Sequence, residues 1–147
     1  MYELILRLIM AITYTFEKKF SKEDTYRLFK SINWYSANFP ERLHKALMSS
    51  QTVVTAWDKD KLVGLARALD DGEMVAFIHY VLVDPEYQGH HIASTLIRMI
   101  KEKYQDYLYI DVMPEDKSNC PFYEKSGFKI MPNGAAMTLF NENSEKR

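Results

Sequence analysis

Residues Val81 to Leu96 read VLVDPEYQGHHIASTL, and this stretch decides the fold of the chain. A run of apolar residues stops at Asp84-Pro85, a short polar turn with Gly89 follows, and a helical pattern then begins with small residues. The order predicts a strand, a turn and a helix whose first main-chain N–H groups point at one spot. Such a spot favours phosphate or pyrophosphate. A turn without any ligand remains the alternative, because glycine-containing turns are common.

The composition is that of one globular domain. The chain has 147 residues, of which 47% are hydrophobic, and its formal net charge is −1. A basic footprint for nucleic acid is therefore not supported, and we expect no nucleic-acid partner. The single cysteine, Cys120, excludes an intramolecular disulfide and fits a reducing compartment, so we expect a cytoplasmic protein.

The two ends of the chain are predicted to lie outside the folded domain. Residues 1–10 are apolar but contain Glu3 and Arg7, and they are shorter than the ~20 apolar residues that span a bilayer. They lack a basic start and a small-residue cleavage site, so we interpret them as an N-terminal extension without membrane contact. Translation from Met10 is the alternative. Residues 142–147 are polar and predict a flexible tail.

Hydrophobic periodicity predicts an α/β chain in which strands and helices are mixed. Two helices are expected first, one after the capping box that begins at Ser21 and one from Phe39-Pro40. Later helices are expected over residues 92–104 and 118–126. Period-two alternation and short apolar runs predict strands over residues 12–16, 52–57, 62–69, 74–83, 108–112, 128–131 and 136–140. This order predicts a mixed sheet with helices on both faces.

A second motif lies some thirty residues after the turn. Residues 119–128 read NCPFYEKSGF, and this segment resembles the Asn…Phe-Tyr-x-x-x-Gly-Phe segment of the GNAT superfamily of N-acetyltransferases. The turn resembles the same family's Gln/Arg-x-x-Gly-x-Gly/Ala pattern at Gln88 and Ala93, but His91 stands where the family usually has glycine. The resemblance implies one GNAT acetyltransferase domain over residues 1–147. Its central sheet would be mixed, mostly antiparallel, with about six or seven strands and about four flanking helices.

The resemblance also implies acetyl-CoA as co-substrate. In the family, main-chain amides of the turn hold the CoA diphosphate, and the side chains of Gln88 and Ser94 would add donors. The Cβ atom of His91 narrows the turn, although amide donation does not require glycine. The residues implied in this contact are Gln88, Gly89, His90, His91, Ile92, Ala93 and Ser94.

The second motif is implied to lie along the pantetheine arm, with Asn119 and Phe122 as contacts. Tyr123 would be the general acid that protonates the leaving thiolate. A phenol with a pKa near 10 stays protonated at pH 7 and can donate to developing charge. The alternative is that Phe122 and Tyr123 are core aromatic residues.

The strand before the turn is implied to face the reacting groups. Main-chain N–H groups near Leu82 and Val83 would polarise the acetyl carbonyl, at the point where the sheet opens towards the next strand. His79 matches a position at which family members carry a proton acceptor, and an imidazole suits that role at neutral pH. A hydrogen-bonded structural histidine is the alternative. Tyr80 should point to the opposite face, so the two are not expected to act together.

The sequence thus predicts an acyltransferase that moves acetyl from acetyl-CoA to a primary amine, on a small molecule or a peptide, by direct attack in a ternary complex. Two alternatives remain open: a non-catalytic acyl-CoA-binding or regulatory domain, and an interaction module without nucleotide affinity. Adjacent His90 and His91 rarely chelate one ion, so no metal is expected. The resemblance allows a homodimer. Trp34, Tyr35 and Phe39 would form an apolar wall for the amine or pack as core.

Overall fold

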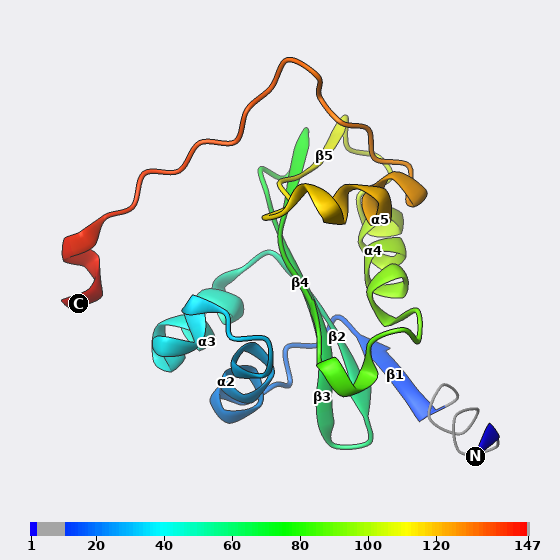
Figure 1. Ribbon diagram of the computed structural model, residues 1–147, viewed down its shortest axis with the longest axis vertical. Coiled ribbons are helices and arrows are strands. Elements are labelled where there is room, and N and C mark those ends of the chain that lie inside the picture. Colours follow the sequence, from blue (N-terminus) through cyan, green and yellow to red (C-terminus); the bar gives the residue numbers. More distant parts are fainter. Residues whose placement is uncertain (3–10, 147) are drawn as a thin grey trace. The chain divides into compact units, whose positions relative to one another are not determined.

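The computed structural model describes residues 1, 2 and 11–146, which belong to two compact units, residues 1–112 and 113–147 (Figure 1). Most of the expected N-terminal extension lies outside the described residues. The first unit is built on a five-stranded sheet in the order β1-β2-β3-β4-β5. Neighbours among β1 to β4 are antiparallel, and β5 runs parallel to β4. The strands are β1 (Ile12–Thr15), β2 (Thr52–Asp58), β3 (Lys61–Asp70), β4 (Val75–Val83) and β5 (Tyr109–Val112).

Helices cover both faces of this sheet, as the sequence predicted. The helices α2 (Lys22–Ser31) and α3 (Pro40–Ser49) lie on one face, joined by the short 3-10 helix η1 (Tyr35–Asn38), and α4 (Ile92–Lys103) lies on the other (Figure 1). The predicted capping box starts α2. The Ser21 hydroxyl accepts the Asp24 N–H at 3.0 Å, and the Asp24 carboxylate accepts the Ser21 N–H at 2.9 Å.

Each face has its own core. On the α2–α3 face, buried leucines and aromatic residues of both helices pack against Leu65 and Leu82 of the sheet. On the α4 face, Gly64 permits a very close approach of the helix. A Cβ atom at this position would lie 2.9 Å from the Ile92 side chain, too close for any real contact. The absence of a side chain at Gly64 therefore lets the first turn of α4 rest directly on β3.

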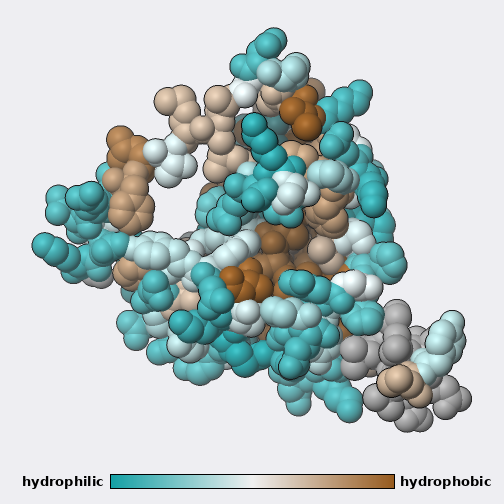
Figure 2. Space-filling model, in the orientation of Figure 1, coloured by the Kyte–Doolittle hydropathy of each residue, from teal (hydrophilic) through white to brown (hydrophobic). Residues whose placement is uncertain are grey.

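The expected strand count of six or seven is corrected to five, because residues 128–131 and 136–140 form no strand. These residues belong to the second unit, which holds η3 (Lys117–Asn119), α5 (Cys120–Lys125) and η4 (Glu142–Lys146). A strand exists only by pairing, and the described part of this unit contains no strand for them to pair with. Their apolar side chains are instead exposed, with Met137 at 91% and Leu139 at 81%, and Figure 2 shows them along the extended segment.

The flexible tail expected over residues 142–147 stays a prediction, and the structure gives a short 3-10 helix, η4, over Glu142–Lys146. The Ser144 N–H donates to the Asn141 carbonyl oxygen at 3.0 Å, and the Ser144 hydroxyl donates to the same oxygen at 2.7 Å. These local bonds form a 3-10 turn without any help from a core, which is why hydropathy gave no sign of it.

Candidate active site

The turn between β4 and α4 leads into a helix start that carries neither a side-chain cap nor an acidic residue. It passes through the 3-10 helix η2 (Pro85–Tyr87) and then places two residues in the left-handed region, Gly89 at φ 82° and His91 at φ 60°. No side chain caps the start of α4, and its first turn contains no acidic residue. By contrast, α2 and α3 both carry acids in their first turns. The first amides of α4 are therefore free of competing negative charge.

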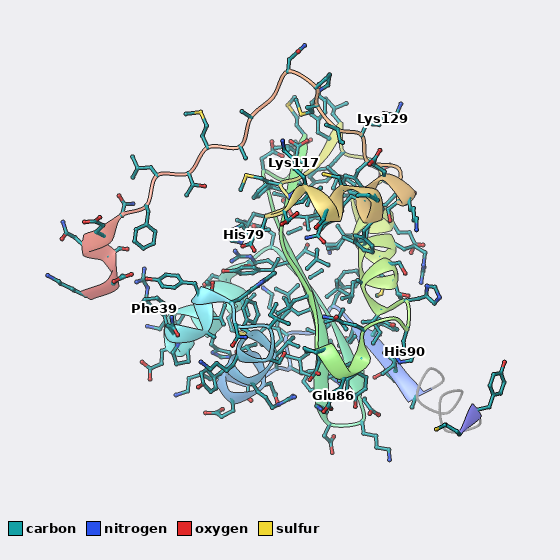
Figure 3. All side chains as sticks on the ribbon, in the orientation of Figure 1. Phe39, His79, Glu86, His90, Lys117 and Lys129 are labelled. Carbon is teal, nitrogen blue, oxygen red and sulfur yellow. The ribbon has the colours of Figure 1, made fainter. Side chains whose placement is uncertain are left out.

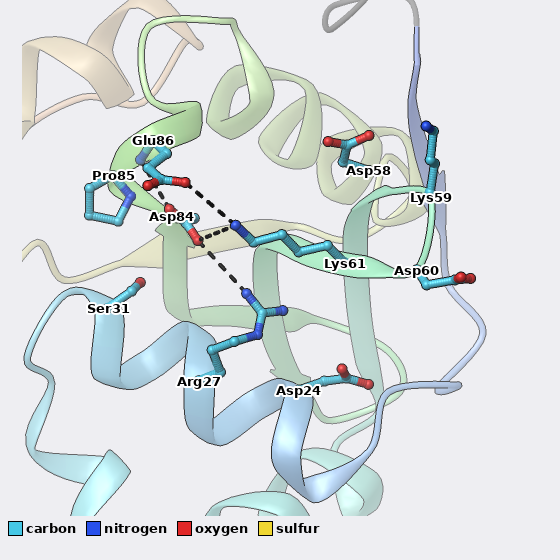
Figure 4. A pocket seen from close by; sticks show the side chains of 10 residues that line it. All are labelled: Asp24, Arg27, Ser31, Asp58, Lys59, Asp60, Lys61, Asp84, Pro85 and Glu86. Atoms are coloured by element: carbon cyan, nitrogen blue, oxygen red, sulfur yellow. Dashed lines mark hydrogen bonds and ion pairs between the residues drawn. The ribbon is translucent and has the colours of Figure 1, made fainter.

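A charge network fixes the start of this turn. Asp84 is buried, accepts the Glu86 N–H at 3.0 Å, and forms ion pairs with Arg27 at 3.9 Å and with Lys61 at 3.7 Å. These groups line an open pocket of about 880 Å³ between α2 and the β2–β3 hairpin (Figure 4). Because its central charges pair with one another, we interpret the pocket as an anchor of the turn. The Asp84-Pro85 stop was the only sequence signal for it.

Tyr87 ties the turn to β2, because its hydroxyl donates to the Asp58 carboxylate at 2.6 Å. That hydrogen bond and burial raise the pKa of Tyr87 to about 12. A raised folded pKa means that the stabilisation is intact below pH ~10 and is lost as the pH rises towards 12. We expect Tyr87→Phe to lower the free energy of unfolding at pH 8 by about 1.5–3 kcal/mol.

The measurement is urea unfolding at pH 8, 10 and 11, with the exposed Tyr26→Phe as matched control. The difference between wild type and Tyr87→Phe should shrink as the pH rises above 10. A difference that stays constant across this range would contradict the assignment.

The side-chain donors expected to face the anion are engaged within the turn. The Gln88 amide donates to the Val83 carbonyl oxygen at 3.1 Å, and the Ser94 hydroxyl donates to the His91 carbonyl oxygen at 3.0 Å. Their contact with a ligand stays a prediction. In this structure both side chains shape the turn, so the donors that remain for an anion are main-chain amides.

His91 occupies the conformation for which the family's glycine is suited. Its φ of 60° lies in the left-handed region, which costs a residue with a Cβ atom about 1–2 kcal/mol. A change to glycine removes this cost, but glycine also raises the conformational entropy of the unfolded chain, which offsets part of the gain in stability. We therefore expect His91→Gly to raise the free energy of unfolding by about 0.5–1 kcal/mol. Urea unfolding checks this, with His91→Ala as control, since alanine keeps the strain. Equal stability of the two variants would contradict it.

The C-terminal part of β4, beyond Ile78, has one unpaired edge among the described residues. This strand pairs with β3 as far as Val83, but its pairing with β5 ends at Ile78 opposite Val112. Beyond Ile78, the edge that faces away from β3 has no partner strand among the described residues. The side chains of Leu82 and Val83 are buried, so a ligand at this edge would meet main-chain groups. The opening that the resemblance implied is therefore present.

A bulge brings His79 and Tyr80 together, which corrects the expectation that they face apart. Arg67 of β3 pairs with Tyr80, whereas Ala68 pairs with Ile78, so His79 is an extra residue in β4. The strict alternation of side chains fails at such a point. The rings of His79 and Tyr80 lie 4.4 Å apart, and Arg67 contacts both, through His79 Nδ1 and through the Tyr80 ring.

The same contact sets the protonation of His79. Burial and the neighbouring Arg67 charge both lower the pKa of His79, so the ring is neutral at pH 7. Because Arg67 can only donate, Nδ1 accepts and the ring proton is on Nε2. Figure 3 shows His79 on the sheet face of α2 and α3, away from His90 at the start of α4. The role of His79 as a base stays a prediction, and it requires release of Nδ1 from Arg67.

The aromatic residues between α2 and α3 divide between core and surface. Trp34 packs edge-on against Phe29 at 5.7 Å and lies 5.6 Å from the Tyr80 ring. Tyr35 is 51% exposed and lies 5.4 Å from Phe39, which Figure 3 places at the start of α3. Trp34 therefore packs as core, whereas Tyr35 and Phe39 present an aromatic surface next to it.

In the second unit, the predicted residues lie on two short helices. Asn119 ends η3 and precedes α5, which carries Phe122 and Tyr123. The Tyr123 ring contacts Phe122 at 5.0 Å and Phe128 at 5.8 Å, and burial raises the pKa of Tyr123. The hydroxyl therefore keeps its proton above neutral pH, as a proton donor must. Its position beside a thioester stays a prediction.

The described residues, 1, 2 and 11–146, offer neither a three-ligand metal site nor a helix for crossing a membrane. In that part of the chain, no three His, Cys, Asp or Glu side chains gather as a metal site. No helix there is long and apolar enough to cross a membrane.

Comparison with known proteins identifies the family. Residues 14–128 match the model of the acetyltransferase (GNAT) family, so the chain belongs to this family of acyltransferases. A GNAT family acetyltransferase from Streptococcus pneumoniae is 28% identical, with a TM-score of 0.77 over 89% of this chain and 98% of its own. A probable acetyltransferase from Staphylococcus aureus is 25% identical, with a TM-score of 0.78 over 88% and 99%.

Curated relatives match over a shorter stretch. A chloroplastic GCN5-related N-acetyltransferase of Arabidopsis thaliana is 36% identical over 75 residues, which is 50% of this chain and 29% of that protein. A histone acetyltransferase of Glycine max is 35% identical over 78 residues, 52% of this chain and 34% of that protein. The match thus spans about a third of these relatives' length.

Proposed function

We propose that the chain is an N-acetyltransferase that moves an acetyl group from acetyl-CoA to a primary amine by direct attack in a ternary complex. The observation that carries the proposal is the turn from Gln88 to His91, with its two left-handed residues and an uncapped, acid-free start of α4. Such a start suits the diphosphate of a coenzyme. Membership in the GNAT family supports acetyl transfer as the chemistry.

The residues divide the task between them. Acetyl-CoA supplies an activated thioester carbonyl. Amides of the turn and the start of α4 would bind the diphosphate, with contacts from Asn119 and Phe122 along the pantetheine arm. Main-chain donors at the open edge of β4 near Leu82 and Val83 would polarise the carbonyl. Most of the rate would come from this positioning and polarisation.

Proton transfer is assigned to two side chains in this proposal. Tyr123 would donate a proton to the leaving thiolate, which suits a half-buried phenol with a raised pKa. His79 would accept a proton from the amine once its Nδ1 atom is released from Arg67. A single domain over residues 1–147, a cytoplasmic location, a homodimer and the choice between a small-molecule and a peptide amine stay predictions.

Two measurements test the proposal. Isothermal titration with acetyl-CoA measures binding of the coenzyme, and thiol release with a panel of amines measures acetyl transfer. Binding without thiol release from any amine would favour a non-catalytic acyl-CoA-binding domain. His91, which stands where the family usually has glycine, favours the same alternative. A bound ligand at a hundred-fold excess over Kd should stabilise the protein by ~2.7 kcal/mol. No thermal shift at millimolar CoA would instead favour an interaction module.

A further inference from the structure

Among the described residues, Arg67 is a buried cation without a carboxylate partner. The residue is 7% exposed, and the ion pairs among the described residues do not include it. In that part of the chain the guanidinium has one hydrogen-bond partner, His79 Nδ1, and its buried Nε atom has none. Burial lowers the pKa of Arg67, which shows that the environment disfavours the charge.

The surroundings compensate this charge only in part. The Arg67 guanidinium lies over the Tyr80 ring, 4.3 Å from its centroid. Tyr80 is itself fixed by a 2.8 Å hydrogen bond to Ser36 and by edge contact with Phe29. A cation–π contact stabilises the charge by less than the burial of an unpaired ion costs. A fold selected for stability alone would place an apolar side chain here.

The Arg67 guanidinium and its partner His79 lie on the α2–α3 face of the sheet (Figure 3). Tyr80 packs against the core of the α2–α3 face, and Arg67 lies on the same face. The first turn of α4 rests on the opposite face, against Gly64, so the diphosphate site and Arg67 are separated by the sheet. An anion at Arg67 is therefore a different group from the coenzyme diphosphate.

We propose that Arg67 binds a carboxylate carried by the acceptor, so that the acceptor is an amine that is also a carboxylic acid. This inference rests on the proposed acetyl transfer. A planar carboxylate that takes the place of His79 Nδ1 on the guanidinium can accept two parallel N–H bonds from it. The Tyr80 ring, over which the guanidinium lies, would flank the organic part of the acceptor.

The test compares matched acceptors with the full chain. Initial rates of CoA release are measured for α- and ω-amino acids and for their carboxamides, each corrected for its fraction of neutral amine. We expect kcat/KM to favour the carboxylates by about 10- to 100-fold, the range for hydrogen bonds to a charged group. In Arg67→Met this preference should fall to near one, mainly through KM for the carboxylates. Arg67→Lys should keep part of it, because lysine keeps the charge and loses the bidentate geometry.

The matched control is Arg98→Met, an exposed residue of α4 whose partner is Glu102, and it should keep the wild-type preference. Equal kcat/KM for carboxylates and carboxamides in the wild type would overturn the inference, as would a preference that survives in Arg67→Met. If Arg67→Met does not fold, Arg67→Lys and the wild-type panel still decide.

A binding measurement separates this inference from the proposed function. Tryptophan fluorescence, to which Trp34 beside Tyr80 contributes, is titrated with the same acceptors without acetyl-CoA. Carboxylate-selective binding that Arg67→Met abolishes, with no transfer to any amine, would support the Arg67 site and overturn acetyl transfer. Transfer without carboxylate selectivity would support acetyl transfer and overturn the Arg67 site. Neither binding nor transfer would overturn both.

Discussion

Tyr123→Phe is expected to lower kcat by ~10²-fold or more at saturating acetyl-CoA, the usual contribution of a positioned general acid. The change removes one hydroxyl and keeps the ring that contacts Phe122 and Phe128. Because packing is retained, KM for acetyl-CoA and the melting temperature should change little. A thiol-trapping assay of CoA release, run with an acceptor from the amine panel, measures the effect.

Tyr26→Phe is the matched control, since Tyr26 is exposed on α2 and no role is assigned to it. It should turn over at the wild-type rate. Unchanged kcat in Tyr123→Phe would remove this residue as the acid, and an equal loss in both variants would point to a general effect of the assay or the fold.

The role of His79 as the base is tested by the pH dependence of the rate. An unshifted acidic limb of the pH–rate profile in His79→Ala would exclude His79 as the base.

Local sequence signals predicted the elements that position the site. The capping box at Ser21 and the stop at Asp84-Pro85 both form as expected. Each of these features depends on a few adjacent residues, which is why a single sequence is enough to find it. Strands β2 and β3 were found as short apolar runs bounded by polar turns, because both of their faces are buried.

Features that depend on pairing between distant segments were missed. The bulge at His79 arises from the register between β3 and β4, which no local pattern encodes, so the relation of His79 to Tyr80 was predicted wrongly. Residues 136–140 alternate like a strand, yet a strand also needs a neighbour. Arg67 did leave a signal in the sequence. It is one cation within the apolar run LVGLARAL of residues 62–69, where burial of an unpaired charge is costly.

The start of α4 offers a prediction in which stability and ligand affinity change in opposite directions. Ser94→Asp places a carboxylate in a first turn that has none, where the helix dipole stabilises negative charge by about 0.3–1 kcal/mol. The free energy of unfolding should therefore rise slightly. The same carboxylate would repel the coenzyme diphosphate by about 1–3 kcal/mol, which corresponds to a roughly 10- to 100-fold weaker Kd for acetyl-CoA.

Ser94→Asn separates charge from shape in this experiment. Asparagine has nearly the volume of aspartate and the same capacity to accept a main-chain N–H, but it carries no charge. Isothermal titration should give Ser94→Asn an affinity for acetyl-CoA at least 10-fold above that of Ser94→Asp, with the difference shrinking at high salt. Equal affinity of the two variants would mean that no diphosphate lies before α4. Since every other assigned contact with acetyl-CoA presupposes that position, the proposed ternary complex would then have to be abandoned.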